Sequence, residues 1–413
     1  MPNTYYSVCD LVEKLRNDTP PSPLQGDPDG YSWIDYRDFL PESYEWINCG
    51  IDQPGGRLLP GIYTPYLYRG QTERHSPCYP NAYRGFGEAD RPRKLSEKLR
   101  TKYLASLIKC HWYASLLQKH PAIFYARKMG IQLNFLALAQ HYELPTHYID
   151  LTQSIEVAAF FACCYPINNK WIPKKTGEGI IYRFCFARLP EAWKMIELVG
   201  LTTLPRPGEQ KAWVAPMNLG GDFEKVPYVE KFIFMHDIKS SRYILNMFKD
   251  GSTLFPEDPA ANIAKAIYVS KKVPTNSVVR ILLQSGCNQD GLEKTFNEIQ
   301  KRLLRYCGLK VQDSVNIDFS KKQLNMLDNY WKEREKDFLK KCGVHAVKIF
   351  KKEEQLTRAE AMRLLKINSN TLRKMIQNNK LKAIKVFEIG SNKDKIFIEK
   401  QSVENLMKKN RQL

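Results

Sequence analysis

The chain has 413 residues, of which 43% are hydrophobic and 12% aromatic, and its formal net charge is +19. This composition excludes a globally disordered chain, because it supplies enough apolar side chains for at least one large core. No run of eighteen apolar residues occurs and the first ten residues lack a signal-peptide pattern, so we predict neither a membrane span nor secretion.

Cysteine usage and the distribution of charge narrow the class of protein further. The ten cysteines are scattered without a CxxC pair, which favours reduced thiols in the cytoplasm over disulfides or zinc. The segment Lys341–Leu413 contains 18 Lys and Arg against 7 Asp and Glu, a net charge of +11. Because more than half of the excess charge lies in this segment, the sequence favours nucleic acid as a partner.

Residues 1–59 are rich in proline, aspartate and aromatic residues. Closely spaced Pro and Gly residues favour turns over long helices or strands. We therefore predict a turn-rich lead-in that packs on the following domain through its aromatic side chains. These side chains are Tyr31, Trp33, Tyr36, Tyr44 and Trp46.

Residues 60–288 alternate between helical and strand-like patterns, which predicts one domain of mixed α+β class. The proline-rich part of this domain, 190–234, predicts loops that join short strands. Helical periodicity covers 92–128, 131–142, Ile155–Cys164, 240–250 and 259–268. Strand-like patterns cover Tyr66–Gln71, Ile180–Phe186 and Val278–Leu283, and a turn is predicted at Asp150–Thr152. Two further helices, 290–308 and 320–341, form a predicted bridge over 289–350.

The first motif of this domain is Tyr68-Arg69-Gly70-Gln71, at the end of its first predicted strand. A guanidinium group beside a glycine that permits close backbone approach suits bidentate binding of a phosphate. The alternative interpretation is an ion pair between Arg69 and Asp150 that only supports the fold.

The second motif runs from Gln140 to Ser154 between two apolar helices and contains His141, Asp150 and Thr152. Polar groups between apolar flanks must find hydrogen-bond partners or form a site. Two structural interpretations stay open. In the first, His141 is a core histidine. In the second, Asp150 and Thr152 cap the helix that begins near Ser154.

The two motifs together resemble those of the FRG family, which is named for an aromatic-Arg-Gly motif. The resemblance covers about residues 60–275, and the stretches Arg206–Trp213 and Leu254–Pro256 also fit it. The matching positions of the second motif and the helix after it are Gln140, His141, Tyr142, Leu144, Pro145, Thr146, Asp150, Thr152, Val157, Ala158, Phe161 and Ala162.

Three positions depart from the family's usual residues. Glu143 stands in place of Gly, His147 in place of Arg and Leu151 in place of Trp. Glu143 puts a left-handed backbone at that position in doubt. His147 removes a permanent positive charge, so a phosphate contact there is absent or depends on pH.

The order of these elements also resembles the layout of ADP-ribosyltransferases. In those enzymes an arginine holds the NAD phosphates, and a hydroxyl residue orients a glutamate that assists transfer from an oxocarbenium-like ribose. Mapped by order, the resemblance implies Arg69 for the phosphates, Thr152 for the hydroxyl, and Glu209 or Gln210 for the catalytic place. A carboxylate is needed there because positive charge develops at the ribose, so Gln210 in that place implies binding without turnover.

The resemblances therefore imply NAD as the cofactor, and the sequence shows no metal-ligand spacing. No P-loop, GxGxxG, HExxH or GxSxG motif occurs, which argues against the corresponding enzyme classes. Glu209 and Gln210 lie in a proline-rich loop, where exposure to solvent is the alternative. The other expected site residues are His141 and Asp150 in catalysis, and Tyr68, Gly70, Gln71, Gln140, Tyr142 and Thr146 in nucleotide binding.

Residues 351–413 have the pattern of a small basic domain with a helix-turn-helix and a wing. Thr357 and Glu360 form a capping box for a first helix, and a polar turn over 366–370 offers Ser369 or Asn370 as the next cap. A second short helix is predicted from Thr371 to Asn378. A hairpin formed by Ala383–Phe387 and Ile396–Ile398 and a last helix over Lys400–Lys409 complete the predicted elements.

This pattern resembles the excisionase or MerR-like type of winged helix-turn-helix domain. The resemblance implies that the second helix enters the major groove while the lysine-rich wing meets the DNA backbone. The alternative is a small helical domain that binds protein. The residues expected to contact DNA are Asn368, Ser369, Asn370, Arg373, Lys374, Gln377, Lys382, Lys385, Lys393 and Lys395.

Two hypotheses about function follow from the sequence. The first is an effector of bacterial defence or toxin type, with an ADP-ribosyltransferase-like domain and a DNA-binding tail. The second is a non-enzymatic regulator whose FRG domain senses a nucleotide while its tail binds DNA. Both are compatible with a homo-oligomer, although no dimerisation element is visible.

Overall fold

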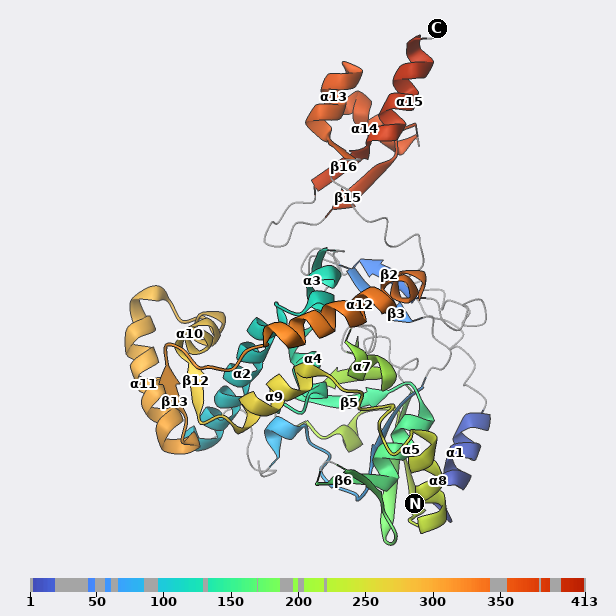
Figure 1. Ribbon diagram of the computed structural model, residues 1–413, viewed down its shortest axis with the longest axis vertical. Helices are drawn as coiled ribbons and strands as arrows, with labels where there is room; N and C mark the ends of the chain where they lie inside the picture. The colour runs from blue at the N-terminus through green and yellow to red at the C-terminus, as the bar shows by residue number, and fades with distance from the viewer. Residues whose placement is uncertain are drawn as a thin grey trace. The chain divides into compact units, whose positions relative to one another are not determined.

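The structure is a computed structural model that divides into two compact units, each described here by itself (Figure 1). The first unit contains residues 1–41, 60–124 and 134–333, and the second contains 42–59, 125–133 and 334–413. The residues that the structure describes are 3–18, 44–48, 56–60, 66–84, 96–128, 133–168, 170–185, 196–199, 204–218, 221–341, 355–378, 380–386 and 395–411.

A seven-stranded sheet of order β1-β11-β8-β4-β5-β10-β9 forms the centre of the first unit. All neighbouring strands are antiparallel except β1 and β11, which are parallel. The sheet therefore contains both parallel and antiparallel pairs. Its strands are β1 (Asn3–Tyr5), β4 (Tyr66–Gln71), β5 (Tyr148–Thr152), β8 (Glu178–Cys185), β9 (Glu197–Leu198), β10 (Ala212–Pro216) and β11 (Val229–Met235).

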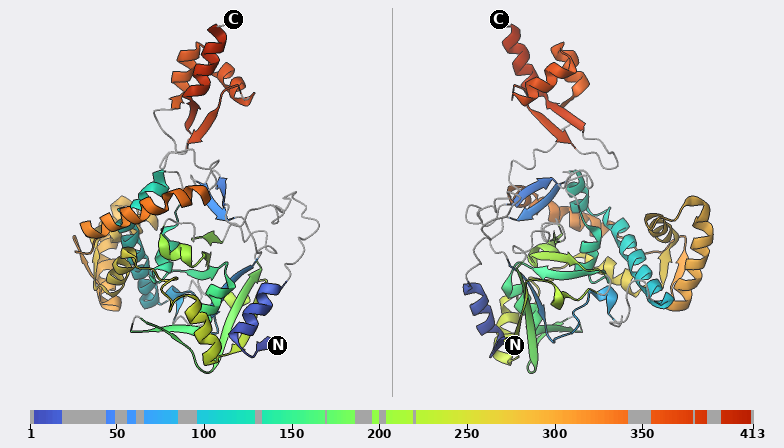
Figure 2. Two further views of the ribbon diagram at one scale, coloured as in Figure 1. Left: turned by 45° about the vertical axis from the view of Figure 1, so that its right-hand side comes forward. Right: turned by 180° about the vertical axis from the view of Figure 1, so that it is seen from behind.

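Three helices pack together over one face of this sheet: α1 (Val8–Asn17), α5 (Ile155–Cys163) and α8 (Ile238–Met247). They lie side by side in both views of Figure 2 as well as in Figure 1. Helix α5 lies directly on β4, and an added Cβ at Gly70 would come 1.8 Å from the carbonyl oxygen of Ala158. Gly70 is thus required for close packing between the strand and the helix.

A second hydrophobic core joins α2 (Glu97–Leu117) to α10 (Thr275–Gln284) and α11 (Gln289–Cys307). A two-stranded parallel sheet of β12 (Lys272–Pro274) and β13 (Lys310–Gln312) packs against the same helices. The predicted strand Val278–Leu283 is wrong, because it lies within α10. The buried residues Ser277, Val278, Ile281 and Leu282 follow the spacing of a helix rather than that of a strand.

The other elements of the first unit are shorter or less central. Asp150–Thr152, predicted as a turn, belongs instead to β5, which pairs along its whole length with β10. The remaining elements are α4 (Phe135–His141), β6 (Cys164–Ile167), β7 (Lys170–Pro173), α7 (Pro205–Glu209), α9 (Pro259–Val269), the 3-10 helices η2 (Asn81–Tyr83) and η5 (Phe223–Lys225), α3 (Pro121–Lys128) and α12 (Lys321–Lys341), of which the last two run into the second unit.

The second unit contains a small domain of helices and a three-stranded sheet, order β14-β16-β15. Its hydrophobic core includes Ala361, Leu372, Leu381, Ile398 and Val403. The elements are β14 (Gln355–Thr357), α13 (Arg358–Leu365), α14 (Ser369–Gln377), β15 (Ala383–Val386), β16 (Lys395–Glu399) and α15 (Lys400–Arg411). A separate two-stranded sheet consists of β2 (Tyr44–Asn48) and β3 (Gly56–Pro60).

The mixed α+β class predicted from the sequence is confirmed. The described part of residues 1–59 contains β1 and α1, two elements of the first unit that the predicted turn-rich lead-in omits. Tyr31, Trp33 and Tyr36 lie outside the described residues, and Tyr44 and Trp46 belong to β2. Among the described residues, no helix is both long and apolar enough to cross a bilayer.

Candidate functional site

Arg69 lies where β4 meets β5 at the centre of the sheet. These two strands, both wholly described, share a single residue pair, Tyr68 opposite Thr152. Beside this pair, Nη1 of Arg69 donates a hydrogen bond to the backbone oxygen of Asp150 (3.0 Å) and lies 3.9 Å from its carboxylate. The side chain of Arg69 is only 11% exposed, and its Nε has no hydrogen-bond partner among the described residues. The predicted contact with Asp150 is therefore present, and one N–H of the guanidinium stays available.

The Asp150 carboxylate lies beside three side chains, those of Arg69, Gln140 and His141. Its Oδ2 accepts a hydrogen bond from Nε2 of Gln140 (2.9 Å), whose Oε1 accepts one from the Thr146 hydroxyl (2.6 Å). Its Oδ1 lies 3.7 Å from Nε2 of His141. The interpretation of Asp150 as a helix cap is wrong, because Ser154 is the N-cap of α5 and accepts from Val157 N–H.

His141 is buried beside this carboxylate. Its Nδ1 lies 3.4 Å from Oε1 of Gln210, and its Nε2 has no hydrogen-bond partner within the described residues. Burial lowers the pKa of His141, although the nearby Asp150 carboxylate acts in the opposite direction. A neutral imidazole at neutral pH follows, with one nitrogen facing Asp150.

Thr152, at the end of β5, contacts Gln210, which lies two residues before β10. The Thr152 hydroxyl donates to the backbone oxygen of Gln210 (2.8 Å) and accepts from Ser154 N–H (3.1 Å). The Gln210 side chain is buried and donates to the backbone oxygen of Leu254 (3.1 Å). Gln210 thus takes the place beside Thr152, while Glu209 is the half-buried last residue of α7.

The residues of the first motif point to opposite faces of the sheet, because side chains alternate along a strand. Gly70 faces α5, and the buried Tyr68 belongs to the core on that side. Arg69 and Gln71 share the other face, where Oε1 of the buried Gln71 has no hydrogen-bond partner among the described residues. The expected nucleotide-binding residues therefore do not converge on one surface, and Arg69 and Gln71 lie on the face away from Tyr68.

Tyr142 belongs to a buried cluster with Arg206 and Asp258, two residues that the sequence did not single out as site residues. The Tyr142 hydroxyl donates to the carboxylate of Asp258, and the Arg206 guanidinium lies 5.7 Å from the Tyr142 ring and 4.5 Å from that of Phe255. Burial raises the pKa of Asp258, whereas the hydrogen bond from Tyr142 lowers it. The tight packing of Tyr142 indicates that this residue has a structural role.

The backbone of Glu143 is left-handed, with φ of 67°. The sequence had put this conformation in doubt, because Glu stands there in place of Gly. The residue follows α4, where the N–H groups of Glu143 and Leu144 bond back to the oxygens of Gln140 and Ala139 and so end the helix. Its carboxylate accepts from Nη2 of Arg206 (2.7 Å). This doubt was wrong, because the helix end imposes the backbone conformation whatever the side chain.

Replacing Glu143 with Gly should make the protein more stable than replacing it with Ala. Both variants lose the carboxylate, but only Gly relieves the left-handed strain, by about 1 kcal/mol. Urea unfolding of the two variants measures the difference. Equal midpoints, or a more stable Glu143→Ala, would show that this backbone position is unstrained.

His147, at the second departure from the family pattern, lies between tyrosine side chains. Its ring stacks on Tyr148 with centroids 4.4 Å apart, and its Nδ1 lies 3.5 Å from the Tyr103 hydroxyl. Burial lowers the pKa of His147. At neutral pH this position therefore contributes no positive charge for a phosphate.

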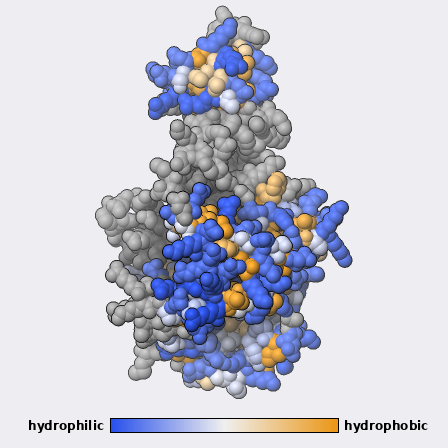
Figure 3. Space-filling view, turned by 90° about the vertical axis from the view of Figure 1, so that its left-hand side faces the viewer, coloured by the Kyte–Doolittle hydropathy of each residue, from blue (hydrophilic) through white to orange (hydrophobic). Residues whose placement is uncertain are grey.

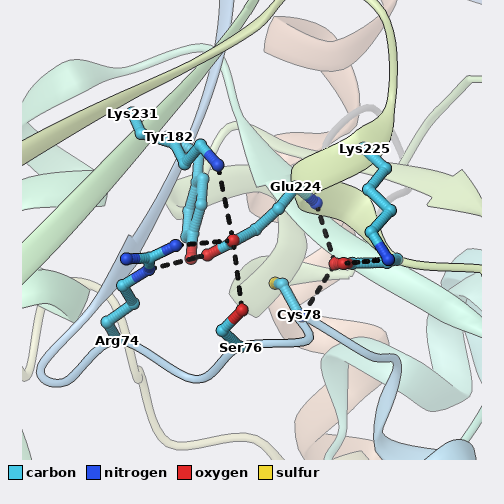
Figure 4. A network of polar contacts seen from close by, with 8 residues as sticks. Arg74, Ser76, Cys78, Tyr182, Glu224, Lys225 and Lys231 are labelled. Carbon is cyan, nitrogen blue, oxygen red and sulfur yellow. Dashed lines mark hydrogen bonds and ion pairs between the residues drawn. The ribbon is translucent and has the colours of Figure 1, made fainter. Parts of the chain in front are cut away.

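A carboxylate that the sequence did not reveal, Glu224, fixes the chain that follows β4 (Figure 4). Its Oε1 accepts from Tyr182 (2.8 Å), and its Oε2 accepts from Arg74 (3.0 Å) and Ser76 (3.4 Å). Lys231 adds an ion pair at 3.4 Å. Because Tyr182 pairs with Arg69 in the sheet, this network secures the strands and the segment next to Arg69.

The Glu224 network predicts a specific acid sensitivity. Burial raises the pKa of Glu224, but the hydrogen bonds from Arg74 and Tyr182 outweigh it and lower the pKa to about 2. A carboxylate with a lowered pKa stabilises the fold above its unfolded-state pKa of about 4.5, and this contribution disappears as pH falls toward about 2.

We therefore expect Glu224→Gln to lower the free energy of unfolding by about 3 kcal/mol at pH 7, and by progressively less below pH 4.5. Urea unfolding of wild type and variant between pH 2.5 and 7 measures this difference. Glu178→Gln, at an exposed position of the same sheet, should leave the pH dependence unchanged. A constant difference across this range would contradict the assigned network.

Comparison with known proteins gives one match. A family model described as FRG domain matches residues 64–170, which include β4, β5, α5 and the Arg69 and Asp150 positions. This chain contains an FRG domain. No curated protein and no solved structure matches the chain significantly.

The FRG match stops before Gln210, so the contact between Thr152 and Gln210 depends on residues beyond the matched span. Strands β8, β10 and β11 also lie after it and complete the sheet around the FRG motif. Within the described residues, no group of three or more His, Cys, Asp or Glu side chains could hold a metal ion.

In the second unit, the capping box of Thr357 and Glu360 is confirmed, and the next helix, α14, begins at Ser369, two residues before the predicted start at Thr371. Asn368, not Ser369 or Asn370, is the N-cap of α14 and accepts from Thr371 N–H (2.9 Å). An N-cap at Asn368 satisfies a free N–H of the first turn.

The expected DNA contacts occupy α14 with its N-cap, the segment before β15, and the β15–β16 hairpin. Arg373, Lys374 and Lys382 are exposed, and Gln377 ends α14. Lys385 lies in β15 and Lys395 begins β16, whereas Lys393 lies outside the described residues. The predicted hairpin is present as the antiparallel pair β15–β16, joined by β14 as a third strand.

Proposed function

We propose that the FRG domain binds NAD, with Arg69 holding its phosphates, and acts on it in an ADP-ribosyltransferase-like manner. The observation that carries this proposal is the order β4-β5-β10 in the sheet, in which Arg69 on β4 contacts Asp150 on β5, and Thr152 on β5 contacts Gln210 just before β10. By their order along the chain, the transferase layout maps its phosphate-binding arginine to Arg69, its hydroxyl residue to Thr152 and its catalytic residue to Glu209 or Gln210.

Unpaired polar atoms around Arg69 support a ligand at this site. Nε of Arg69, Oε1 of Gln71, Nε2 of His141 and Oδ1 of Asp150 are all buried and have no hydrogen-bond partner among the described residues. A buried polar atom without a partner costs about 1–3 kcal/mol, so four of them around one strand junction favour a polar molecule that pairs with them. A dinucleotide offers phosphate oxygens for the guanidinium and hydroxyl groups for the acceptors.

The second candidate function is a nucleotide sensor that does not consume its ligand. Gln210 favours it, because this amide, held by Leu254 and beside His141, occupies the place next to Thr152. An amide cannot stabilise an oxocarbenium-like ribose as a carboxylate does. Asp150 is the carboxylate that lies next to Arg69, and in the enzymatic case we assign it the stabilising role.

Release of nicotinamide from NAD separates the two candidates. The full chain is incubated with NAD, with and without duplex DNA, beside Asp150→Asn and Gln210→Ala. Nicotinamide release that Asp150→Asn abolishes supports the enzyme. Binding of NAD without release in any sample supports the sensor, and absence of both binding and release would overturn the proposal for the FRG domain.

We further propose that residues 355–411 bind duplex DNA. The exposed Arg373 and Lys374 on α14, the exposed Lys382 and the antiparallel pair β15–β16 after the two helices support a winged helix-turn-helix mode of binding. The net charge of +11 over Lys341–Leu413 adds the electrostatic component of backbone contacts. An effector of bacterial defence or toxin type, positioned or regulated by DNA, combines these two activities.

Salt-dependent binding of a fluorescent duplex to the full chain tests this part. Each phosphate contact releases a counterion, so affinity falls as salt rises. We expect Arg373→Ala and Lys374→Ala together to make the plot of log affinity against log salt less steep, by about 2 in slope. The exposed pair Arg363→Ala and Lys366→Ala, before α14, is the matched control. Absence of duplex binding at low salt, or equal loss in both pairs, would contradict binding through α14.

A further inference from the structure

A cluster of lysines lies on the first unit, far along the chain from the basic tail. It consists of Lys102 and Lys109 on α2, Lys271 and Lys272 at the start of β12, and Lys310 at the start of β13. Four of these five residues are exposed and Lys109 is half-buried. Figure 3 faces the side of the unit that carries α10 and α11, where hydrophilic side chains surround hydrophobic groups.

Backbone and electrostatic contacts hold four of these five lysines near one another. Lys272 pairs directly with Lys310 across the two parallel strands, and Lys310 N–H donates to the Lys271 oxygen (2.9 Å). Nζ of Lys109 donates to the backbone oxygens of Tyr268 (2.6 Å) and Ser270 (3.1 Å), just before β12. Burial lowers the pKa of Lys109, and the charge of Lys271 lowers it further.

Local acidic side chains do not neutralise this cluster. None of its five lysines forms an ion pair with a carboxylate within the described part of the chain. Glu97, in the first turn of α2, already contacts Arg302 (3.3 Å) and Tyr306 (2.7 Å). The ammonium groups of Lys272 and Lys310 carry like charges on neighbouring strands and repel each other, so this pair does not stabilise the sheet.

An aromatic side chain stands at the edge of the cluster. Tyr268 is 54% exposed, and Nζ of Lys109 lies 5.9 Å from the centre of its ring. The neighbouring Val269 is also exposed, at 63%. Lysines beside an exposed tyrosine are the combination that binds a single nucleic-acid strand, since the amines contact phosphates while a base stacks on the ring.

We propose that this lysine cluster with Tyr268 is a second nucleic-acid site, which binds single-stranded nucleic acid without reading its sequence. It is separate from the duplex-binding role proposed for the tail and does not depend on it. It is also separate from the Arg69 site, because the cluster is built on α2, β12 and β13 rather than on the seven-stranded sheet. The occupant follows from the chemistry: a flexible polyanion with exposed bases.

The test is binding of fluorescent oligodeoxythymidine to the full chain, with Lys272→Glu/Lys310→Glu compared with Lys239→Glu/Arg242→Glu. The control residues are exposed on α8 and undergo the same change of charge. We expect the cluster variant to lose at least tenfold in affinity at about 50 mM salt and the control to lose much less. Equal affinities in the two variants would overturn the proposal.

Two more measurements distinguish this site from the duplex-binding tail and from a membrane-binding surface. Tyr268→Ala should weaken binding of oligodeoxythymidine about fivefold or more while leaving duplex binding unchanged, as expected for a stacking platform. Arg373→Ala/Lys374→Ala should weaken duplex binding and spare oligodeoxythymidine, so the two proposals can fail independently. Binding of the cluster to phosphatidylserine vesicles but not to oligodeoxythymidine would replace the proposal with a membrane-surface site.

Discussion

Gly70→Ala is expected to abolish stable folding of the first unit. The new Cβ would lie 1.8 Å from the Ala158 oxygen and 2.7 Å from the Ala162 nitrogen, both of which belong to the α5 backbone. Backbone atoms of a packed helix cannot move aside as a flexible side chain can. Strand β4 and α5 would have to separate across the core, which we expect to cost about 4 kcal/mol or more.

Soluble yield and thermal unfolding followed by circular dichroism measure this effect. Gly286→Ala is the control, because Gly286 has a left-handed φ of 86° but no atom within 4 Å of an added Cβ. It should cost only the backbone strain, about 1 kcal/mol. A Gly70→Ala protein as stable as Gly286→Ala would contradict the close packing of β4 on α5 and the structural reason for glycine in the aromatic-Arg-Gly motif.

Asp150→Asn is expected to strengthen binding of anions at Arg69, whereas Arg69→Ala should abolish it. The Asp150 carboxylate lies 3.9 Å from Nη1 of Arg69 and offsets part of its charge, while the hydrogen bond to the Asp150 backbone oxygen is kept in the variant. Asparagine keeps an oxygen that can accept from Gln140. Removing the negative charge should raise the affinity for NAD about tenfold, given an effective dielectric between those of protein and water.

Titration calorimetry with NAD and with inorganic pyrophosphate measures this change. Glu178→Gln, which removes an exposed carboxylate from β8, should leave both affinities unchanged. Loss of NAD binding in a folded Asp150→Asn protein would contradict the assignment, because it would mean that the carboxylate itself holds the ligand. Unchanged affinities would mean that the phosphates bind away from Arg69.

Sequence patterns located the local elements of this chain well, because they depend on neighbours along the chain. The capping box at Thr357, the apolar run of α5 and the alternation of β8 each predicted an element that the structure contains. Val278–Leu283 was misassigned because a short run of β-branched and leucine residues fits either a strand or a helix. Only packing against α2 and α11 decides between them.

The candidate site was predicted less completely, because its contacts join distant parts of the chain. The motifs identified Arg69, Asp150 and Thr152, and the pairing of Arg69 with Asp150 was one of the stated interpretations. The role of Glu224 could not be predicted from any local pattern, because this residue lies 150 positions beyond its partner Arg74. The choice between Glu209 and Gln210 likewise depended on the register of β5 against β10.

The opposite faces of Tyr68 and Arg69 show another limit of motif reading. Residues that are adjacent in a motif point to opposite sides of a strand, so a motif mixes side chains for a site with side chains for the core. Tyr68 and Gly70 pack toward α5, while Arg69 reaches Asp150. The aromatic-Arg-Gly sequence thus combines two residues that pack in the core with an arginine that reaches Asp150.

The most direct test of the central claim is calorimetric titration of NAD into the full chain, wild type beside Arg69→Lys. Lysine keeps the positive charge but loses the planar fork that binds two phosphate oxygens at once. We predict that wild type binds NAD, and that the variant, with an unfolding temperature close to that of wild type, binds at least tenfold more weakly. Equal binding by both proteins, or no binding by wild type, would contradict a phosphate site at Arg69.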